Sequence, residues 1–223
     1  MRRSLALFPL GTVLFPGLVL PLHIFEERYR ALVRELLAQP GEQREFGVIA
    51  IREGRETGVA GVTALHEVGC VAAIRELTEH ADGRFDLVTV GTRRFRLLGL
   101  LEPQPYLVGE VAELPEVGGK DAEVAPAVRE VQRGFSGYLD ALATEGPARI
   151  TIPDLPDDPL LLSYLVAAAM VIDLPDRQYL LAQPDAVSRL DAERRLLARE
   201  TALLTSLGTT PAPGLRSSPY SLN

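Results

Sequence analysis

Cysteine, lysine and histidine are scarce in the 223-residue sequence, and each scarcity narrows the chemistry that the chain can perform. Cys70 is the only cysteine, which excludes an internal disulfide, and we expect it to lie buried because a free cysteine packs as a small hydrophobe. Lys120 is the only lysine among 23 basic residues, so any lysine-dependent catalysis would rest on one position. The preference for arginine, with frequent alanine and proline, is typical of a GC-rich bacterial genome.

The chain also lacks an apolar run long enough to span a bilayer, which takes about 20 residues. The longest candidate, residues 160–172, is interrupted by Ser163. The apolar run that follows Arg2 and Arg3 superficially resembles a signal peptide, but three prolines interrupt it and no small-residue cleavage site follows it. We therefore expect a cytoplasmic protein with no membrane segment.

The charge balance opposes nucleic acid as a partner. The net charge is −7, whereas a protein that binds phosphate backbones needs a basic surface. The one basic cluster contains Arg93, Arg94 and Arg96, and Phe95 between them could stack on a base. In a strand, however, Phe95 would share the face of Arg93, which favours a core position for Phe95 and acidic cross-strand partners for the arginines. RNA binding therefore stays an alternative rather than the leading hypothesis.

The first segments of the chain have the patterns of a β-rich unit with one helix. Residues 5–22 predict strand, turn and strand, with the turn at the Pro-Gly pair 16–17, where proline fixes φ and glycine allows a positive φ. Apolar residues spaced four, three and four apart then predict a helix. Its apolar face would be formed by Phe25, Tyr29, Leu32 and Leu36.

Strand signals continue up to about residue 114. FGVIAI (46–51) predicts a short buried strand, and residues 69–100 predict a hairpin with Asp82-Gly83 as its turn. Gly91 interrupts the second strand of this hairpin and indicates a bulge or bend. Residues 106–114 add an alternating strand. Five or more short strands with bends predict a curled sheet or a small barrel, which removes exposed sheet edges.

The second half of the chain switches to helical spacing. We expect a linker over residues 115–121 and a helical bundle over 122–208, with one helix opening at Asp158-Pro159 and a long last helix capped by Asp185. Residues 209–223 are rich in proline, serine and threonine and predict a disordered tail. Together with a β-rich domain over residues 1–114, these boundaries predict an α+β fold.

Four segments carry a family resemblance: FPLGTVLFPGLVLPLHIFEERYRALV, VGCVAAIRELTEHADGRFDLVTVGTRRFRLLGL, PYLVGEVAELPE and DDPLLLSYLVAAAMVIDLPDRQYLLAQPDAVSRLDAERRLLARETALL. In this order they resemble the substrate-binding amino-terminal domain of Lon-type proteases, over residues 5–207. The resemblance implies a β-barrel like that of pseudouridine synthases and archaeosine transglycosylases (PUA-like), followed by an α-helical bundle.

The resemblance also implies a function. In full-length Lon this region helps to recognise unfolded or tagged substrates and supports assembly, and a related domain occurs in cereblon, a ubiquitin-ligase substrate receptor. We therefore expect a noncatalytic module that binds unfolded or extended polypeptide segments or a partner protein, as an adaptor or chaperone-like factor in protein quality control. The sequence assigns no peptide-binding residue and no oligomeric state.

The catalytic motifs of the Lon proteases do not occur in the sequence. A phosphate-binding loop needs G-x-x-x-x-G-K-[ST], but the only Gly-Lys pair, in VGGKD, lacks the first glycine, and Asp121 replaces the hydroxyl residue that would hold magnesium. A Ser-Lys dyad needs a lysine with a lowered pKa beside the serine, whereas Lys120 lies in a glycine-rich linker where we expect it to be solvated. We therefore expect no enzyme activity, no catalytic residue and no cofactor.

The histidines give no clear metal site. His66 and Cys70 are four residues apart, but a glycine between them indicates a loop that enters a strand, and a structural metal site needs four ligands. We expect His80 to be exposed beside the hairpin turn. His23, with Glu26, lies at a strand-to-helix junction, where a capping or packing role is favoured over acid–base chemistry.

Asp154, Asp157 and Asp158 are paired carboxylates in sequence, but prolines separate them, and loop and N-cap roles explain them more simply. A hydrolase with an unrecognised site remains the second alternative. It requires Ser163, His66 or a carboxylate pair to converge in one pocket.

Overall fold

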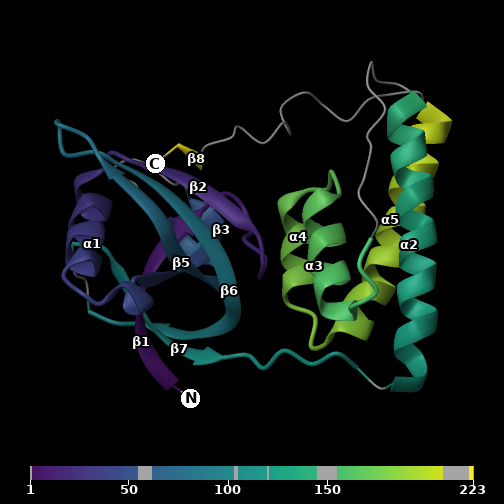
Figure 1. Cartoon of the computed structure of the whole chain (residues 1–223), viewed down its shortest axis with the longest axis horizontal. Helices are drawn as coiled ribbons and strands as arrows, with labels where there is room; N and C mark the ends of the chain where they lie inside the picture. Colours follow the sequence, from purple (N-terminus) through teal and green to yellow (C-terminus); the bar gives the residue numbers. More distant parts are fainter. Residues whose placement is uncertain are drawn as a thin grey trace. The chain divides into compact units, whose positions relative to one another are not determined.

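The structure is a computed structural model that describes residues 2–54, 62–102, 105–119, 121–144, 155–207 and 221–222. It divides into a barrel unit, residues 1–115 with 217–223, and a helical unit, residues 116–216 (Figure 1). The barrel unit contains β1 (Arg2–Leu10), β2 (Val19–Ile24), α1 (Glu27–Leu37), a short 3-10 turn (Gly41–Gln43), β3 (Glu45–Gly54), β4 (Val62–Leu65), β5 (Val68–Glu79), β6 (Phe85–Leu100), β7 (Leu107–Glu113) and β8 (Ser221–Leu222).

Five of these strands close into a ring. β1 pairs in parallel with β3, and antiparallel pairs join β3 to β5, β5 to β6, β6 to β7 and β7 back to β1. The long strand β6 makes this closure possible, because along one of its edges β2 pairs with residues 85–90 and β7 with residues 95–100. The expected curled sheet or small barrel is therefore a closed five-stranded barrel, within the α+β fold that the sequence predicts.

A compact apolar cluster fills the interior of the barrel. Its buried members come from all five strands of the ring: Leu5, Leu7, Ile49, Val71, Phe95 and Val111. Glycines make room for them, since a Cβ at Gly69 would lie 2.4 Å from the Phe95 ring and one at Gly47 would lie 2.9 Å from both Leu5 and Phe95. Phe95 thus takes the core position that strand alternation predicts.

A second apolar layer lies on the other face of β1, β3, β5 and β6, where β2 and α1 cover it (Figure 1). Tyr29, Leu32 and Leu36 of α1 are buried in this layer, as the helical spacing predicts, and Val33 is buried with them. Phe25 differs from the prediction: α1 begins at Glu27, so Phe25 precedes the helix, and its side chain is 40% exposed.

Two glycines in the β5–β6 hairpin have the roles that the sequence predicts. Gly83 has a positive φ of 77° in the turn. At Gly91 the β5–β6 register shifts, and Gly91 exchanges backbone hydrogen bonds with residues 17 and 18 of the loop before β2. A Cβ at Gly91 would lie 2.3 Å from the carbonyl oxygen of Phe15, so this close approach admits only glycine.

The helical unit contains α2 (Asp121–Thr144), α3 (Pro159–Ala169), α4 (Leu174–Leu181) and α5 (Ala186–Leu207). Aspartates cap three of these helices: Asp158 accepts from the amide of Leu161, Asp173 from that of Asp176, and Asp185 from that of Ser188. The caps at Asp158 and Asp185 are those predicted from the sequence.

The core of the helical unit buries two charged residues of α5. The Arg189 guanidinium donates to the Ser163 hydroxyl (2.9 Å), the Tyr164 hydroxyl (3.1 Å) and the Leu180 carbonyl (3.1 Å). Glu193, one turn later, is also fully buried, and neither of its carboxyl oxygens has a hydrogen-bond partner in the described part of the chain. Burial raises the pKa of Glu193 well above its ordinary value.

Some expected features fall outside what the structure describes. Lys120 and Asp154 are among the residues that are not described, and so are residues 209–220 of the expected disordered tail. The two described tail residues, Ser221–Leu222, form β8, which pairs in parallel with Leu22 and His23 of β2. None of the described helices is both long and apolar enough to cross a membrane.

Candidate functional site

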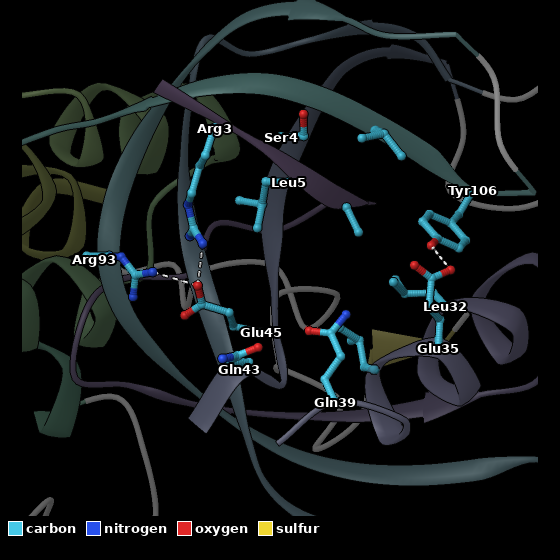
Figure 2. Close-up of a pocket in the computed structure, with 13 residues that line it drawn as sticks. Arg3, Ser4, Leu5, Leu32, Glu35, Gln39, Gln43, Glu45, Arg93 and Tyr106 are labelled. Atoms are coloured by element: carbon cyan, nitrogen blue, oxygen red, sulfur yellow. Dashed lines mark hydrogen bonds and ion pairs between the residues drawn. The ribbon is translucent and has the colours of Figure 1, made fainter. Parts of the chain in front are cut away.

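A polar pocket of about 650 Å³ opens on the barrel unit between β1, α1 and the start of β3 (Figure 2). On one side, Glu45 accepts from Arg3 Nη1 at 2.5 Å and from Arg93 Nη2 at 2.6 Å. Arg93 also pairs with Glu113 of β7. Burial alone would raise the pKa of Glu45, but the hydrogen bonds from Arg93 and Arg3 hold it below its ordinary value.

The opposite wall of the polar pocket holds a second short contact. Tyr106 donates its hydroxyl to Glu35 Oε2 at 2.5 Å, and burial together with the Glu35 carboxylate raises the pKa of Tyr106 to about 12. The phenol therefore stays protonated. No histidine, cysteine or lysine is among the described residues that line the polar pocket. These groups can hold polar parts of a ligand, but they do not form a nucleophile with an activating base.

An apolar groove of about 370 Å³ lies elsewhere on the barrel unit, between β4 and the end of β6. We call it the leucine groove; it is lined by Ala64, Leu65, Glu67, Leu97, Leu98, Gly99, Leu100 and Leu107. Leu98 and Leu100 are 42% and 54% exposed. In the described part of the chain β4 stands at the end of the sheet and pairs only with β3. The groove thus combines exposed leucines with a strand edge.

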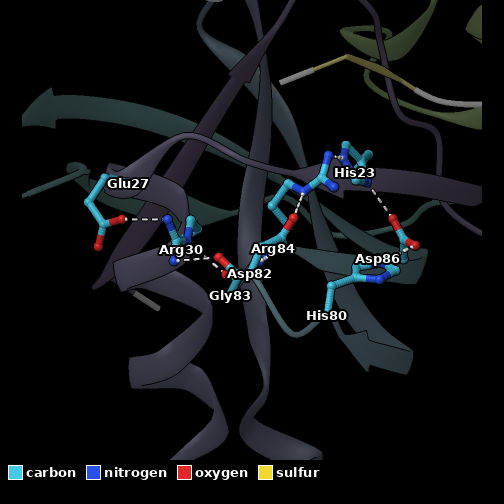
Figure 3. Close-up of polar contacts among 8 residues, drawn as sticks. All are labelled: His23, Glu27, Arg30, His80, Asp82, Gly83, Arg84 and Asp86. Atoms are coloured by element: carbon cyan, nitrogen blue, oxygen red, sulfur yellow. Dashed lines mark hydrogen bonds and ion pairs between the residues drawn. The ribbon is translucent and has the colours of Figure 1, made fainter.

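A third cluster joins two histidines through one carboxylate (Figure 3). His23 Nδ1 lies 2.6 Å from Asp86 Oδ1, and His80 Nε2 lies 2.6 Å from Asp86 Oδ2. The hydrogen bond from His23, and to a smaller extent the one from His80, lowers the pKa of Asp86. Within the described residues this is the one group of three side chains that could hold a metal ion.

Sequence reasoning did not find this cluster. We expected His23 to have a capping or packing role at the strand-to-helix junction and His80 to be exposed beside the turn. The structure leaves His80 partly exposed but places both imidazoles at hydrogen-bond distance from Asp86. The link to His23 depends on the β2–β6 register, which places His23 opposite Asp86, 63 residues later. No pattern of neighbouring residues in the sequence predicts a contact that depends on strand register.

The candidates named from the sequence have structural roles. Cys70 is buried, as predicted, and its thiol contacts the Val71 carbonyl. His66 is not part of the three-residue cluster. Its pKa is lowered, mainly by burial and to a smaller extent by the positive charge of Arg52. Asp157 accepts a hydrogen bond from Gln132.

Ser163 does not have the partners of a nucleophile. Its hydroxyl donates to the Leu160 carbonyl and accepts from Arg189, so it is bound to no base. Asp158 acts as the N-cap of α3. Neither residue supports the hydrolase alternative.

The basic cluster is largely absorbed into the fold. Arg93 has the acidic cross-strand partners that we expected, Glu45 and Glu113. Arg94 is buried and donates to the Pro115 carbonyl, which strand alternation did not predict. Only Arg96 of the three is exposed. The cluster therefore does not form the continuous basic surface that RNA binding requires.

The protein is therefore an α+β protein of a particular class: a closed barrel that carries surface pockets, followed in the chain by a helical unit. Comparison with protein families then identifies the particular family. Residues 4–199 match the ATP-dependent protease La (LON) substrate-binding domain, and the chain belongs to this family.

Individual relatives agree with this assignment. The chain is 28% identical to Lon protease 2 of Syntrophobacter fumaroxidans over 86% of its own length, and 30% identical to the Lon protease of Methylocella silvestris over 91%. It spans only about a quarter of the length of these relatives: 24% of the first and 25% of the second.

Solved structures support the same fold. A Lon N-terminal domain protein from Xanthomonas campestris superposes with a TM-score of 0.62 at 26% identity, covering 88% of this chain and 98% of that one. The N-terminal domain of a Mycobacterium avium complex Lon protease gives a TM-score of 0.61 at 22% identity, covering 90% and 98%. The matched part of the Lon proteases is thus their substrate-binding domain.

Proposed function

We propose that this chain binds extended or unfolded polypeptide segments, or a partner protein, without catalysing a reaction on them. It would act as an adaptor or chaperone-like factor in protein quality control, in the bacterial cytoplasm. The observation that carries the proposal is the leucine groove, in which Leu98 and Leu100 lie exposed near an edge of β4 that has no partner strand among the described residues. Membership of the Lon substrate-binding family supports the same class of ligand.

The leucine groove offers both features that recognition of an extended chain needs. Backbone groups on a free strand edge can pair with a peptide of any sequence, and apolar pockets beside the edge select alternate side chains. The exposed leucines would then be buried by apolar side chains of the ligand, which is the main favourable term in such association. Affinity for sequences rich in apolar residues, with little dependence on their order, follows from this mode.

The noncatalytic part of the proposal is supported by the side chains of the described residues. The polar pocket contains no nucleophile with an activating base, and Ser163 is bound to Arg189. No cofactor is proposed. A peptidase activity of the purified chain on an unfolded protein such as casein would contradict this part.

A binding assay tests the proposal. A fluorescently labelled, permanently unfolded protein, made by reduction and carboxymethylation, is titrated with the full chain and followed by anisotropy. We expect binding by the wild type and at least about tenfold weaker binding by the double variant Leu98→Gln with Leu100→Gln, since two anchors of an apolar interface are lost.

A matched control replaces two exposed leucines of the helical unit, Leu161→Gln with Leu203→Gln, which are 52% and 44% exposed. This variant loses a similar apolar surface but leaves the leucine groove intact, so its affinity should equal that of the wild type. Equal affinity of all three proteins, or stronger loss in the control, would remove the leucine groove as the binding site.

A further inference from the structure

We propose that His23, His80 and Asp86 bind a zinc ion, with water in the fourth position. The cluster joins three parts of the barrel unit: β2 carries His23, β6 carries Asp86, and His80 follows β5 in the hairpin turn. Two imidazoles and one carboxylate are zinc ligands, and three protein ligands with an open fourth position form a known type of zinc site. This inference is independent of polypeptide binding.

The distances place the three ligands near a zinc geometry. One ligand atom from each of the three residues lies within 4.8 Å of the other two. Ligand atoms around tetrahedral zinc are roughly 3.4 Å apart, given Zn–N distances near 2.0–2.1 Å. Closing the remaining gap takes about 1.4 Å at most. The side chains of His23, His80 and Asp86 are 25%, 39% and 42% exposed, so rotation of the imidazoles can supply this movement.

The backbone around the cluster is already held in place. His23 and Asp86 are directly opposite each other in the β2–β6 ladder. His80 closes the turn, since its amide donates to the Arg84 carbonyl (2.9 Å) and its carbonyl accepts from Gly83 (2.8 Å). Helix α1 also holds this hairpin turn in place, because Arg30 Nε donates to the Gly83 carbonyl at 2.7 Å (Figure 3).

The donor set favours zinc over magnesium or calcium. Imidazole nitrogen suits zinc and neighbouring transition metals, whereas magnesium and calcium require oxygen ligands. In the metal-free cluster His23 Nδ1 and His80 Nε2 both lie at hydrogen-bond distance from Asp86. In the zinc-bound cluster each neutral imidazole would carry its one proton on the other ring nitrogen, which leaves the nitrogen that faces Asp86 free to bind the metal. The carboxylate that orients both rings thereby becomes the third ligand.

One cation opposes the ion. Arg84 Nη1 lies 3.4 Å from His23 Nε2, and Arg84 also pairs with Asp82 at 2.7 Å. When zinc occupies His23 Nδ1, Nε2 carries a proton and repels the guanidinium, so Arg84 must turn toward Asp82 and solvent. Removing the positive charge of Arg84 should therefore strengthen zinc binding. If the cluster only stabilised the fold through hydrogen bonds, removing Arg84 would not have this effect.

The experiment is a competition titration of Zn²⁺ between a chromophoric chelator and the untagged full chain. We expect one zinc per chain. His23→Ala or His80→Ala should weaken binding by more than about 100-fold, because even the outer partners of metal ligands contribute roughly 10- to 100-fold. Arg84→Gln should tighten it by roughly three- to tenfold through loss of a nearby positive charge.

The third histidine provides the matched control, since His66→Ala removes an imidazole outside the cluster and should leave the zinc affinity unchanged. Circular dichroism shows whether each variant is folded. Co²⁺ gives an independent readout, because a four-coordinate site produces an intense visible spectrum that should vanish in Asp86→Asn. No uptake of zinc by the wild type, or equal losses in the His66 and His23 variants, would overturn the proposal.

Discussion

A carboxyl group in the barrel unit and one in the helical unit have opposite surroundings. In the barrel unit, Glu45 lies between Arg3 and Arg93, and both arginines donate to it. In the helical unit, Glu193 is fully buried and its carboxyl has no hydrogen-bond partner among the described residues. The comparison teaches that hydrogen bonds from two arginines favour the ionised form of a partly buried carboxyl, whereas full burial without a hydrogen-bond partner favours the protonated form.

The two units differ in their glycines as well. In the barrel interior, a Cβ at Gly69 would lie 2.4 Å from Phe95 and 2.5 Å from the Val48 carbonyl, although one at Gly99 near the end of β6 would meet nothing within 4 Å. In α2, by contrast, a Cβ at Gly137 would meet nothing within 4 Å. The same substitution, glycine to alanine, should therefore have opposite effects in the two units.

The largest expected effect is that of Gly69→Ala. The added methyl group collides with the Phe95 ring and with a backbone oxygen that cannot move away, so we expect a loss of about 3 kcal/mol in the free energy of unfolding. Urea denaturation followed by tyrosine fluorescence measures it. Gly99→Ala is the matched control on β6, where a Cβ meets nothing within 4 Å. Equal stabilities of the two variants would contradict a closed and filled barrel.

The next effect concerns the buried carboxyl of the helical unit. Glu193→Leu replaces it with an apolar side chain of similar size. We expect the helical unit to gain about 2 kcal/mol, because the desolvation cost of a carboxyl without a hydrogen-bond partner outweighs its attraction to Arg189. Glu130→Leu is the control, since Glu130 is 55% exposed on α2 and its contact with Arg194 is on the surface. Destabilisation by Glu193→Leu would show that the carboxyl has a partner.

The pH dependence of stability should also distinguish the units. Burial raises the pKa of Glu193 above its ordinary value of 4.5. Its contribution to the free energy of unfolding is therefore fully present below about pH 4.5 and is lost as the pH rises through the folded pKa. Hydrogen bonds lower the pKa of Glu45, so its contribution is present above its unfolded pKa and is lost as pH falls through the folded pKa. Glu193→Gln should reduce the loss of stability with rising pH, and Glu45→Gln should reduce the loss of stability with falling pH.

Glu45→Gln should have a smaller effect on stability at neutral pH. The amide keeps one acceptor but removes the carboxylate that lies 2.5 Å from Arg3 and 2.6 Å from Arg93, while Arg93 keeps its second ion pair with Glu113, and we expect a loss of about 1 kcal/mol. Glu79→Gln, at an exposed position of β5, should change stability by less than about 0.5 kcal/mol. A thermal melt at two salt concentrations checks the origin, since high salt should reduce the difference.

Features with local signals were predicted from the sequence. The turn at Asp82-Gly83 and the caps at Asp158 and Asp185 depend on residues close in the chain, and the structure confirms them. Glu193 also had a signal that was missed: it lies three residues after Leu190, on the face that Leu197 continues, so helical spacing alone places it in the core.

The candidate sites had no such signal because they depend on ring closure and strand register. His23 meets Asp86 only through the β2–β6 pairing. Leu98 and Leu100 have the pattern of ordinary strand residues, and their exposure follows from the extension of β6 beyond Val68, the first residue of β5. Sequence periodicity determines which face a residue takes, but the closure of the barrel determines which faces remain open.

The smallest expected effect completes the comparison of glycines. Gly137→Ala in α2 adds a methyl group that meets nothing within 4 Å and removes the conformational freedom of glycine from a helix interior, so we expect a gain of about 0.5–1 kcal/mol. Urea denaturation followed by the helical circular dichroism signal measures it. Gly134→Ala, whose Cβ would lie at an ordinary 3.6 Å from Leu197, should behave similarly. Destabilisation by both variants would mean that α2 is packed as tightly as the barrel, and the contrast between the two units would be lost.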